Sequence, residues 1–191
     1  FIMKRVGIAS LSTVALIAGI TFSNQIPVVA NIFESGAAVA QNAKKGQVQL
    51  RLKAEKKIVT QDAQGQRKVT WQELSNGAQV QQGEVLRYSV SGANNGEKAV
   101  NNLAINQPIP RGMAYVLNSA TVNQKDGAQI TYSINGGKTY VKNPTIKVKL
   151  ADGTVETRPA PDTAYTHVRW NFGKSVPGKG TVNGTYQVRV R

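Results

Sequence analysis

The sequence of 191 residues contains no cysteine. This absence excludes disulfide frameworks, thiolate-bound zinc, iron–sulfur clusters and cysteine nucleophiles. Acidic residues are also scarce, with 10 Asp and Glu against 24 Lys and Arg, which gives a net charge of +14. The basic excess predicts anionic surroundings or an anionic partner. Because hydrophobic residues make up 40% and charged residues 18% of the chain, the composition favours a folded domain over a disordered polycation.

Histidine is nearly absent, because His167 is the only one. A Ser-His-Asp site would depend on it, but no G-x-S-x-G segment accompanies it, and a lone histidine on a predicted strand is typical of a structural residue. The acidic residues show neither the pairing of catalytic carboxylates nor a calcium-binding cluster. We therefore expect no enzymatic activity, no metal and no cofactor. A periplasmic hydrolase that uses His167 is the enzymatic alternative.

The first 40 residues have the layout of a secretory signal peptide. Lys4 and Arg5 precede the uncharged stretch 6–22, and small residues follow at 28–30 and 38–40. Cleavage after Ala40 is the preferred prediction because the sequence then turns polar, while cleavage after Ala30 and retention as an uncleaved anchor stay open. Cleavage after Ala40 would lower the net charge by only one. The layout predicts export to the periplasm, the surface or the exterior of a bacterial cell.

Beyond residue 41, hydrophobic and polar residues alternate with the period of two that half-buried β-strands show. Gly, Asn, Asp and Pro separate the alternating runs, and they predict turns at Asn76-Gly77, Asn135-Gly136-Gly137, Asp152-Gly153 and Asn183-Gly184. The pattern contains no convincing amphipathic helix. It predicts an all-β, antiparallel sandwich of about nine strands. The clearest runs are 48–52, 85–90, 100–105, 115–117, 130–134, 146–150, 168–170 and 186–190.

Three segments follow from this reading. Residues 1–40 form the signal segment, 41–74 form a basic N-terminal strand and hairpin extension, and 75–191 form the main domain. Within the extension, 47–62 and 67–74 are expected to pair as a hairpin. Glycine and proline residues are expected to set the turn geometry of the main domain without any catalytic role. These turn residues are Gly83, Gly96, Pro110, Gly112, Gly136 and Gly137.

Several motifs from residue 82 onward follow one another in an order that resembles a known family. They are Gln-Gly-Glu-Val-Leu-Arg-Tyr-Ser-Val (82–90), Asn-Asn-Gly (94–96), Ile-Pro-Arg-Gly-Met-Ala-Tyr (109–115), Asn-Ser-Ala (118–120) and Tyr-Ser-Ile-Asn-Gly-Gly-Lys-Thr-Tyr (132–140). This order resembles the bacterial surface conserved repeat domain known as domain of unknown function eleven, in its single-domain cyanobacterial versions. The resemblance implies an immunoglobulin-like sandwich in a secreted or surface protein without established enzymatic activity. Asn135 stands where the family commonly has Asp, which argues against a metal-binding turn.

Basic residues recur along the predicted strands. Alternation places Lys147 and Lys149 on one strand face, and it likewise places Arg189 and Arg191 on one face. Such residues can protect strand edges from aggregation, or they can contact an acidic polysaccharide, lipid headgroups or an acidic protein. Aromatic residues make up only 6% of the chain and are expected in the core, which disfavours nucleic-acid binding. The candidate contacts are Lys53, Lys56, Lys57, Lys147, Lys149, Arg189 and Arg191.

The sequence thus predicts an exported, non-catalytic structural or interaction module that presents basic strand faces to an anionic partner of the cell envelope. A second hypothesis is homotypic assembly into a fibre or layer. In that case the basic, alternating segment 41–59 would complete the sheet of a neighbour by β-augmentation.

Overall fold

The protein is described from a computed structural model, which covers residues 39–41, 47–75, 78–123, 127–173 and 175–191. The predicted signal segment up to residue 38 and the predicted Asn76-Gly77 turn lie outside these residues. The described part of the chain is built of strands, with one short 3-10 turn, η2 (Asp162–Ala164). Within it, no helix has the length and apolar character needed to cross a membrane.

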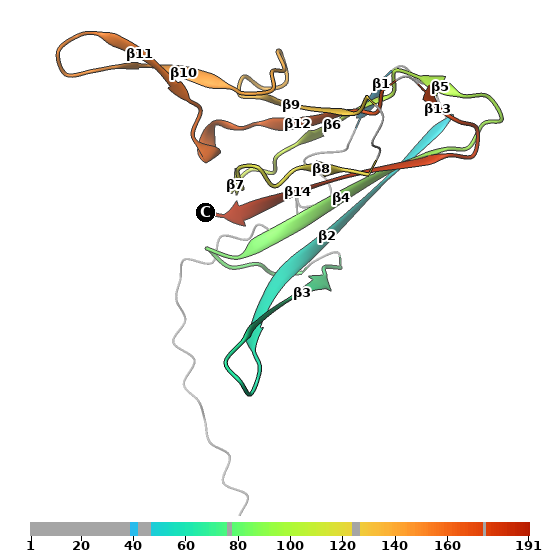
Figure 1. Ribbon diagram of the computed structural model, residues 1–191, viewed down its shortest axis with the longest axis horizontal. Helices are drawn as coiled ribbons and strands as arrows, with labels where there is room; N and C mark the ends of the chain where they lie inside the picture. Colours follow the sequence, from blue (N-terminus) through green and yellow to red (C-terminus); the bar gives the residue numbers. More distant parts are fainter. Residues whose placement is uncertain (1–38, 42–46, 76–77, 124–126, 174) are drawn as a thin grey trace, which may run out of the picture.

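Two antiparallel sheets form the body of the molecule (Figure 1). The larger sheet has the order β3 (Arg67–Glu73), β2 (Val48–Gln61), β4 (Val85–Asn94), β14 (Thr181–Val190) and β7 (Met113–Tyr115), and β8 (Thr121–Val122) also pairs with β14. The smaller sheet has the order β1 (Val39–Gln41), β6 (Ala104–Pro108), β12 (His167–Asn171) and β9 (Gln129–Ser133). Two further strand pairs join β10 (Thr145–Lys149) to β11 (Val155–Pro159), and β5 (Val100–Asn101) to β13 (Ser175–Val176).

The hydrophobic alternation that predicted the strands also accounts for the core. Along β4 every second residue is buried, and its inward residue Tyr88 lies opposite Tyr186 of β14. Trp170 of the smaller sheet is fully buried with them. The prediction of an all-β, antiparallel protein is therefore confirmed, and the arrangement is consistent with a β-sandwich.

One predicted turn is wrong. Asn183 and Gly184 lie inside β14, where they pair with Ser91 and Val90 of β4. An Asn-Gly pair favours a turn locally, but here the absence of a side chain on Gly184 leaves room for a core residue. A Cβ atom on Gly184 would lie 2.5 Å from Cε2 of Trp170. Packing of the Trp170 indole against the β14 backbone thus outweighs the local turn preference.

The predicted hairpin is present, but only part of it extends from the sheet. β2 and β3 pair from Glu55↔Glu73 to Gln61↔Arg67. The N-terminal half of β2, from Val48 to Lys56, pairs with β4 instead. This half is therefore a full strand of the larger sheet, and the hairpin projects only beyond it.

A second hairpin, β10–β11, projects from the body at the upper left of Figure 1. The predicted Asp152-Gly153 turn joins its strands, and the Asp152 carboxylate accepts hydrogen bonds from the N–H and hydroxyl of Thr154. The sequence predicted β10 but not β11. All five residues of β11 are exposed, so no hydrophobic alternation marks this strand.

The residues expected to set turn geometry behave in two ways. Gly83, Gly112, Gly136 and Gly137 adopt positive φ values between 74° and 87°. Gly96 does not; its N–H instead donates to the side-chain oxygen of Asn94, and the Pro110 carbonyl accepts a bond from Met113.

Candidate basic interaction surface

On the outer face of the larger sheet, Lys53 and Arg87 are held by carboxylates of the same chain. Glu55 of β2 lies opposite Arg87 of β4, and its carboxylate contacts the Arg87 guanidinium at 2.7 Å. Lys53 lies 3.4 Å from Glu55 and 3.0 Å from Glu73 of β3. The Glu55 side chain is only 11% exposed. Hydrogen bonding to Glu73 and the charge of Glu55 raise the pKa of Lys53, so the network keeps this lysine charged and paired.

Trp71 belongs to this network and not to the core, so the expectation of core packing is wrong. Its half-buried ring lies under the Arg87 guanidinium, whose central carbon is 4.2 Å from the ring centroid. Trp71 sits on the hairpin strand β3, which is an edge strand of the larger sheet. A cation above the ring provides a cation–π contact instead of apolar packing.

Two more predicted contact residues are also paired. The Lys56 ammonium lies 3.1 Å from a Glu84 carboxylate oxygen, and Arg189 lies 3.2 Å from Asp162. Lys57 has no carboxylate within 4.0 Å among the described residues, and the same is true of the exposed terminal Arg191. The larger sheet therefore uses most of its predicted contact residues in ion pairs.

The projecting hairpin differs, because Lys147 and Lys149 are exposed and have no carboxylate within 4.0 Å in the described part of the chain. Residues paired across antiparallel strands share a face, and these lysines lie opposite Thr157 and Val155. The acidic residue of β11, Glu156, points to the other face. There its carboxylate contacts Arg158 at 2.7 Å.

The smaller sheet carries a further cation that the sequence did not single out. The Arg169 guanidinium lies over the Tyr140 ring, with 3.6 Å between its central carbon and the ring centroid. The Arg169 Nε donates a hydrogen bond of 2.6 Å to the Asn106 side chain on β6. No described carboxylate lies within 4.0 Å of it. Alternation with the buried Val168 and Trp170 was the sequence pattern that could have placed Arg169 on the outer face.

His167 lies on the same face of β12, two residues before Arg169. Its ring meets the edge of Tyr140, and its Nδ1 lies 3.1 Å from the Thr166 hydroxyl. Burial lowers the pKa of His167 below its ordinary value, so the ring is neutral at pH 7. The positive charge of this face therefore comes from arginine and lysine alone.

Next to this cluster, the 133–139 loop uses its polar side chains to hold its own shape. The Ser133 hydroxyl accepts bonds from the N–H groups of Asn135 and Gly137. The Asn135 side chain accepts from the Thr139 N–H and donates to the Thr139 hydroxyl. The polar groups of these motif residues are thus hydrogen-bonded to one another within the loop. Within the described residues, no group of three His, Cys, Asp or Glu is placed to hold a metal ion.

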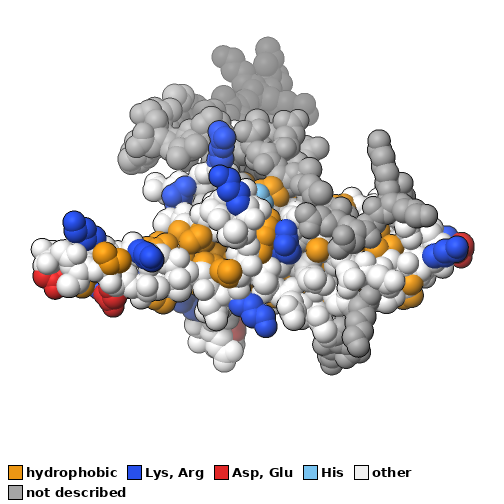
Figure 2. Space-filling model, turned by 90° about the horizontal axis from the view of Figure 1, so that it is seen from above, with side chains coloured by type: hydrophobic (Ala, Val, Ile, Leu, Met, Phe, Trp, Pro, Cys, Tyr) orange, Lys and Arg blue, Asp and Glu red, His pale blue; other side chains and the backbone are white. Residues whose placement is uncertain are grey.

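Figure 2 shows the molecule from the side of the smaller sheet and the hairpin. Lys and Arg side chains, in blue, are spread along this face, whereas Asp and Glu side chains, in red, appear mainly at its two ends. Hydrophobic side chains lie between the cations. We name Lys147, Lys149 and Arg169 the unpaired basic set, because none of the three has a carboxylate within 4.0 Å among the described residues.

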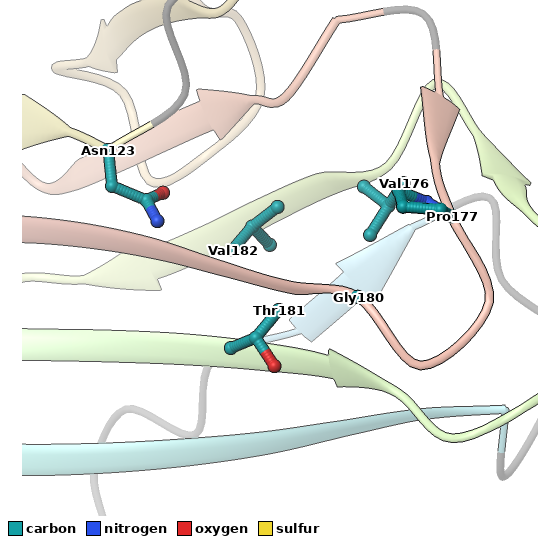
Figure 3. Close-up of a pocket in the computed structure, with 6 residues that line it drawn as sticks. All are labelled: Asn123, Val176, Pro177, Gly180, Thr181 and Val182. Atoms are coloured by element: carbon teal, nitrogen blue, oxygen red, sulfur yellow. The ribbon is translucent and has the colours of Figure 1, made fainter.

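A shallow hollow of about 240 Å³ lies at the β13–β14 end (Figure 3). Val176 and Val182 supply its apolar wall, and the Asn123 side chain is already used to accept the Asn183 N–H at 2.7 Å. None of its lining residues is ionisable, so it provides no acid–base or ligating group. The six lining residues are Asn123, Val176, Pro177, Gly180, Thr181 and Val182.

Comparison of the chain with family models, with curated proteins and with solved structures found no match.

Proposed function

We propose that the protein is an exported, non-catalytic module that binds an acidic polysaccharide of the bacterial cell envelope through the unpaired basic set. One observation carries the proposal. Lys53, Lys56, Arg87 and Arg189 on or next to the larger sheet are paired with carboxylates of the chain, whereas Lys147, Lys149 and Arg169 have no carboxylate within 4.0 Å among the described residues.

The arrangement of these cations suits a polymer better than a single small anion. Lys147 and Lys149 are two residues apart on one strand face, so their Cα atoms are separated by roughly 7 Å. Arg169 stands on a different sheet, held in place by Tyr140 and Asn106. A chain with repeated carboxylates can engage separated cations one after another, and the guanidinium fork is suited to a carboxylate.

The proposal also includes an immunoglobulin-like fold for the sandwich and membership of the chain in the conserved repeat family. Support comes from the order of the motifs between 82 and 140 and from the two antiparallel sheets that enclose one core. Export is supported by the basic, apolar and small-residue order of the first 40 residues.

The direct test measures binding of the full chain to a carboxylated polysaccharide at increasing ionic strength, with a neutral polysaccharide as control. We expect affinity to fall steeply with salt, since the contacts are between exposed charges. Anionic vesicles and an acidic peptide, offered under the same conditions, distinguish a lipid or protein partner. Binding that ignores salt, or no binding to the polysaccharide at low salt, would contradict the proposal.

Homotypic assembly is a second candidate function, favoured by one observation. Residues 48–53 of β2 are paired on the β4 side, but no described strand pairs with their other side. Because β2 stays in its own sheet, the form of β-augmentation that fits the structure joins two sheet edges and does not exchange a strand.

A further inference from the structure

The open part of the β2 edge is short and well defined. At one end β3 begins to cover the edge, where the Leu74 N–H donates to the Ala54 carbonyl at 2.9 Å. At the other end, the Gln47 carbonyl accepts from the Asn95 N–H on the β4 side. Between Gln47 and Ala54, residues 48–53 of β2 have no strand partner in the described chain on the side away from β4.

Backbone alternation says which groups lie on that open side. Neighbouring residues of a strand direct their N–H and C=O groups to opposite sides. The Gln47 carbonyl faces β4 and the Ala54 carbonyl faces β3, so the odd-numbered residues face β4. The backbone groups of Val48, Leu50 and Leu52 therefore lie on the open side, and the side chains of these residues are only partly buried.

We propose that two copies of the chain form a two-fold symmetric dimer through these edges, antiparallel and centred on Leu50. This inference rests on homotypic assembly as the second candidate function. Centring on Leu50 pairs it with its own copy and pairs Val48 with the partner's Leu52. All three open residues then exchange backbone hydrogen bonds, about six in total.

The charges on the outer face agree with this register. Arg51 lies opposite the partner's Gln49, and Lys53 lies opposite the partner's Gln47, so no two cations face each other. Moving the centre to Arg51 would set two arginines opposite each other, and it would direct Val48 to the partner's Ala54, which is already bonded to β3. Like charges directly opposite one another destabilise a strand pair.

The dimer also continues the core. Val48, Leu50 and Leu52 pack against the buried cluster from its margin, where they keep part of their surface exposed. In the proposed register each meets an apolar residue of the partner on the same inner face. The contact then removes both apolar surface and unpaired backbone groups from water, the two liabilities of an exposed strand edge.

The test uses charge variants of the exposed Gln49, which lies opposite the partner's Arg51 twice in each dimer. Sedimentation velocity over a range of concentrations should show association of the full chain. We expect roughly threefold to tenfold tighter association for Gln49→Glu and a similar weakening for Gln49→Lys. The matched variants Gln61→Glu and Gln61→Lys, on the same strand within the hairpin, should leave association unchanged.

Amide hydrogen exchange separates the possible failures. In the dimer the amides of Val48, Leu50 and Leu52 gain protection as concentration rises, while those of Gln49, Arg51 and Lys53 are protected throughout by β4. Association without this change, or without a response to the Gln49 variants, would overturn the Leu50-centred dimer and leave homotypic assembly standing. A full chain that stays monomeric at every concentration would overturn both.

Discussion

The outer face of the larger sheet and the projecting β10–β11 hairpin are both rich in basic residues on alternating strands, but their cations have different surroundings. On the larger sheet, strand register brings Glu55 opposite Arg87 and next to Lys53. On the hairpin, register brings Thr157 and Val155 opposite the lysines. The residues across the strand, and not the local density of positive charge, therefore decide which cations are available to a partner.

The largest expected effect comes from a substitution that disturbs the packing between the larger and the smaller sheet. Gly184→Val should destabilise the fold by about 3 kcal/mol, because its Cβ would collide with the fully buried Trp170. Chemical denaturation measures the loss, and the neighbouring exposed change Asn183→Thr is the control. A Gly184→Val protein as stable as the parent would show that this contact does not fix the sheets.

A smaller effect should follow from removing a carboxylate of the larger sheet, because its cations then lose an ion-pair partner. Glu55→Gln removes the carboxylate shared by Lys53 and Arg87 and should cost about 2 kcal/mol of stability. It should also strengthen the binding of anionic polymers to this face, because Lys53 and Arg87 lose a paired carboxylate. Denaturation and polysaccharide binding report the two effects.

The control for this change is Glu73→Gln, because the Glu73 side chain is 67% exposed and contacts only Lys53 among the ion pairs of the described residues. Its cost should be below about 1 kcal/mol. If Glu55→Gln altered neither stability nor binding, the pairing on the larger sheet would not be what distinguishes the two regions.

The smallest effect concerns pH. Burial lowers the pKa of His167 in the folded protein, so the unfolded chain binds the proton more readily. The stability contributed by the neutral ring is present above about pH 6.5 and is lost as the pH falls through the folded pKa. Thermal unfolding between pH 7.5 and 5 should show a decline that is weaker in His167→Gln. Equal declines in both proteins would remove His167 as the cause.

Much of the fold could be predicted because β4 and β14 alternate strictly between core and solvent. β11 could not, since it is exposed on both faces, and Gly184 was misread because its reason lies in Trp170, which is distant in sequence. The candidate site likewise has a part that the sequence pattern predicts and a part that it does not. Alternation placed Lys147 and Lys149 on one face, but the pairing of Lys56 with Glu84 depends on residues 28 positions apart. Sequence alone does not give that proximity.

The most direct test of the account compares two double variants that remove the same charge from the two regions. Lys147→Gln with Lys149→Gln removes two unpaired cations of the hairpin, and Lys53→Gln with Arg189→Gln removes two cations of the larger sheet that are held in ion pairs. Binding to a carboxylated polysaccharide is measured for each from low to high salt. The account predicts about tenfold weaker binding and a shallower salt dependence for the hairpin variant alone. Equal losses in both variants, or no loss in the hairpin variant, would contradict it.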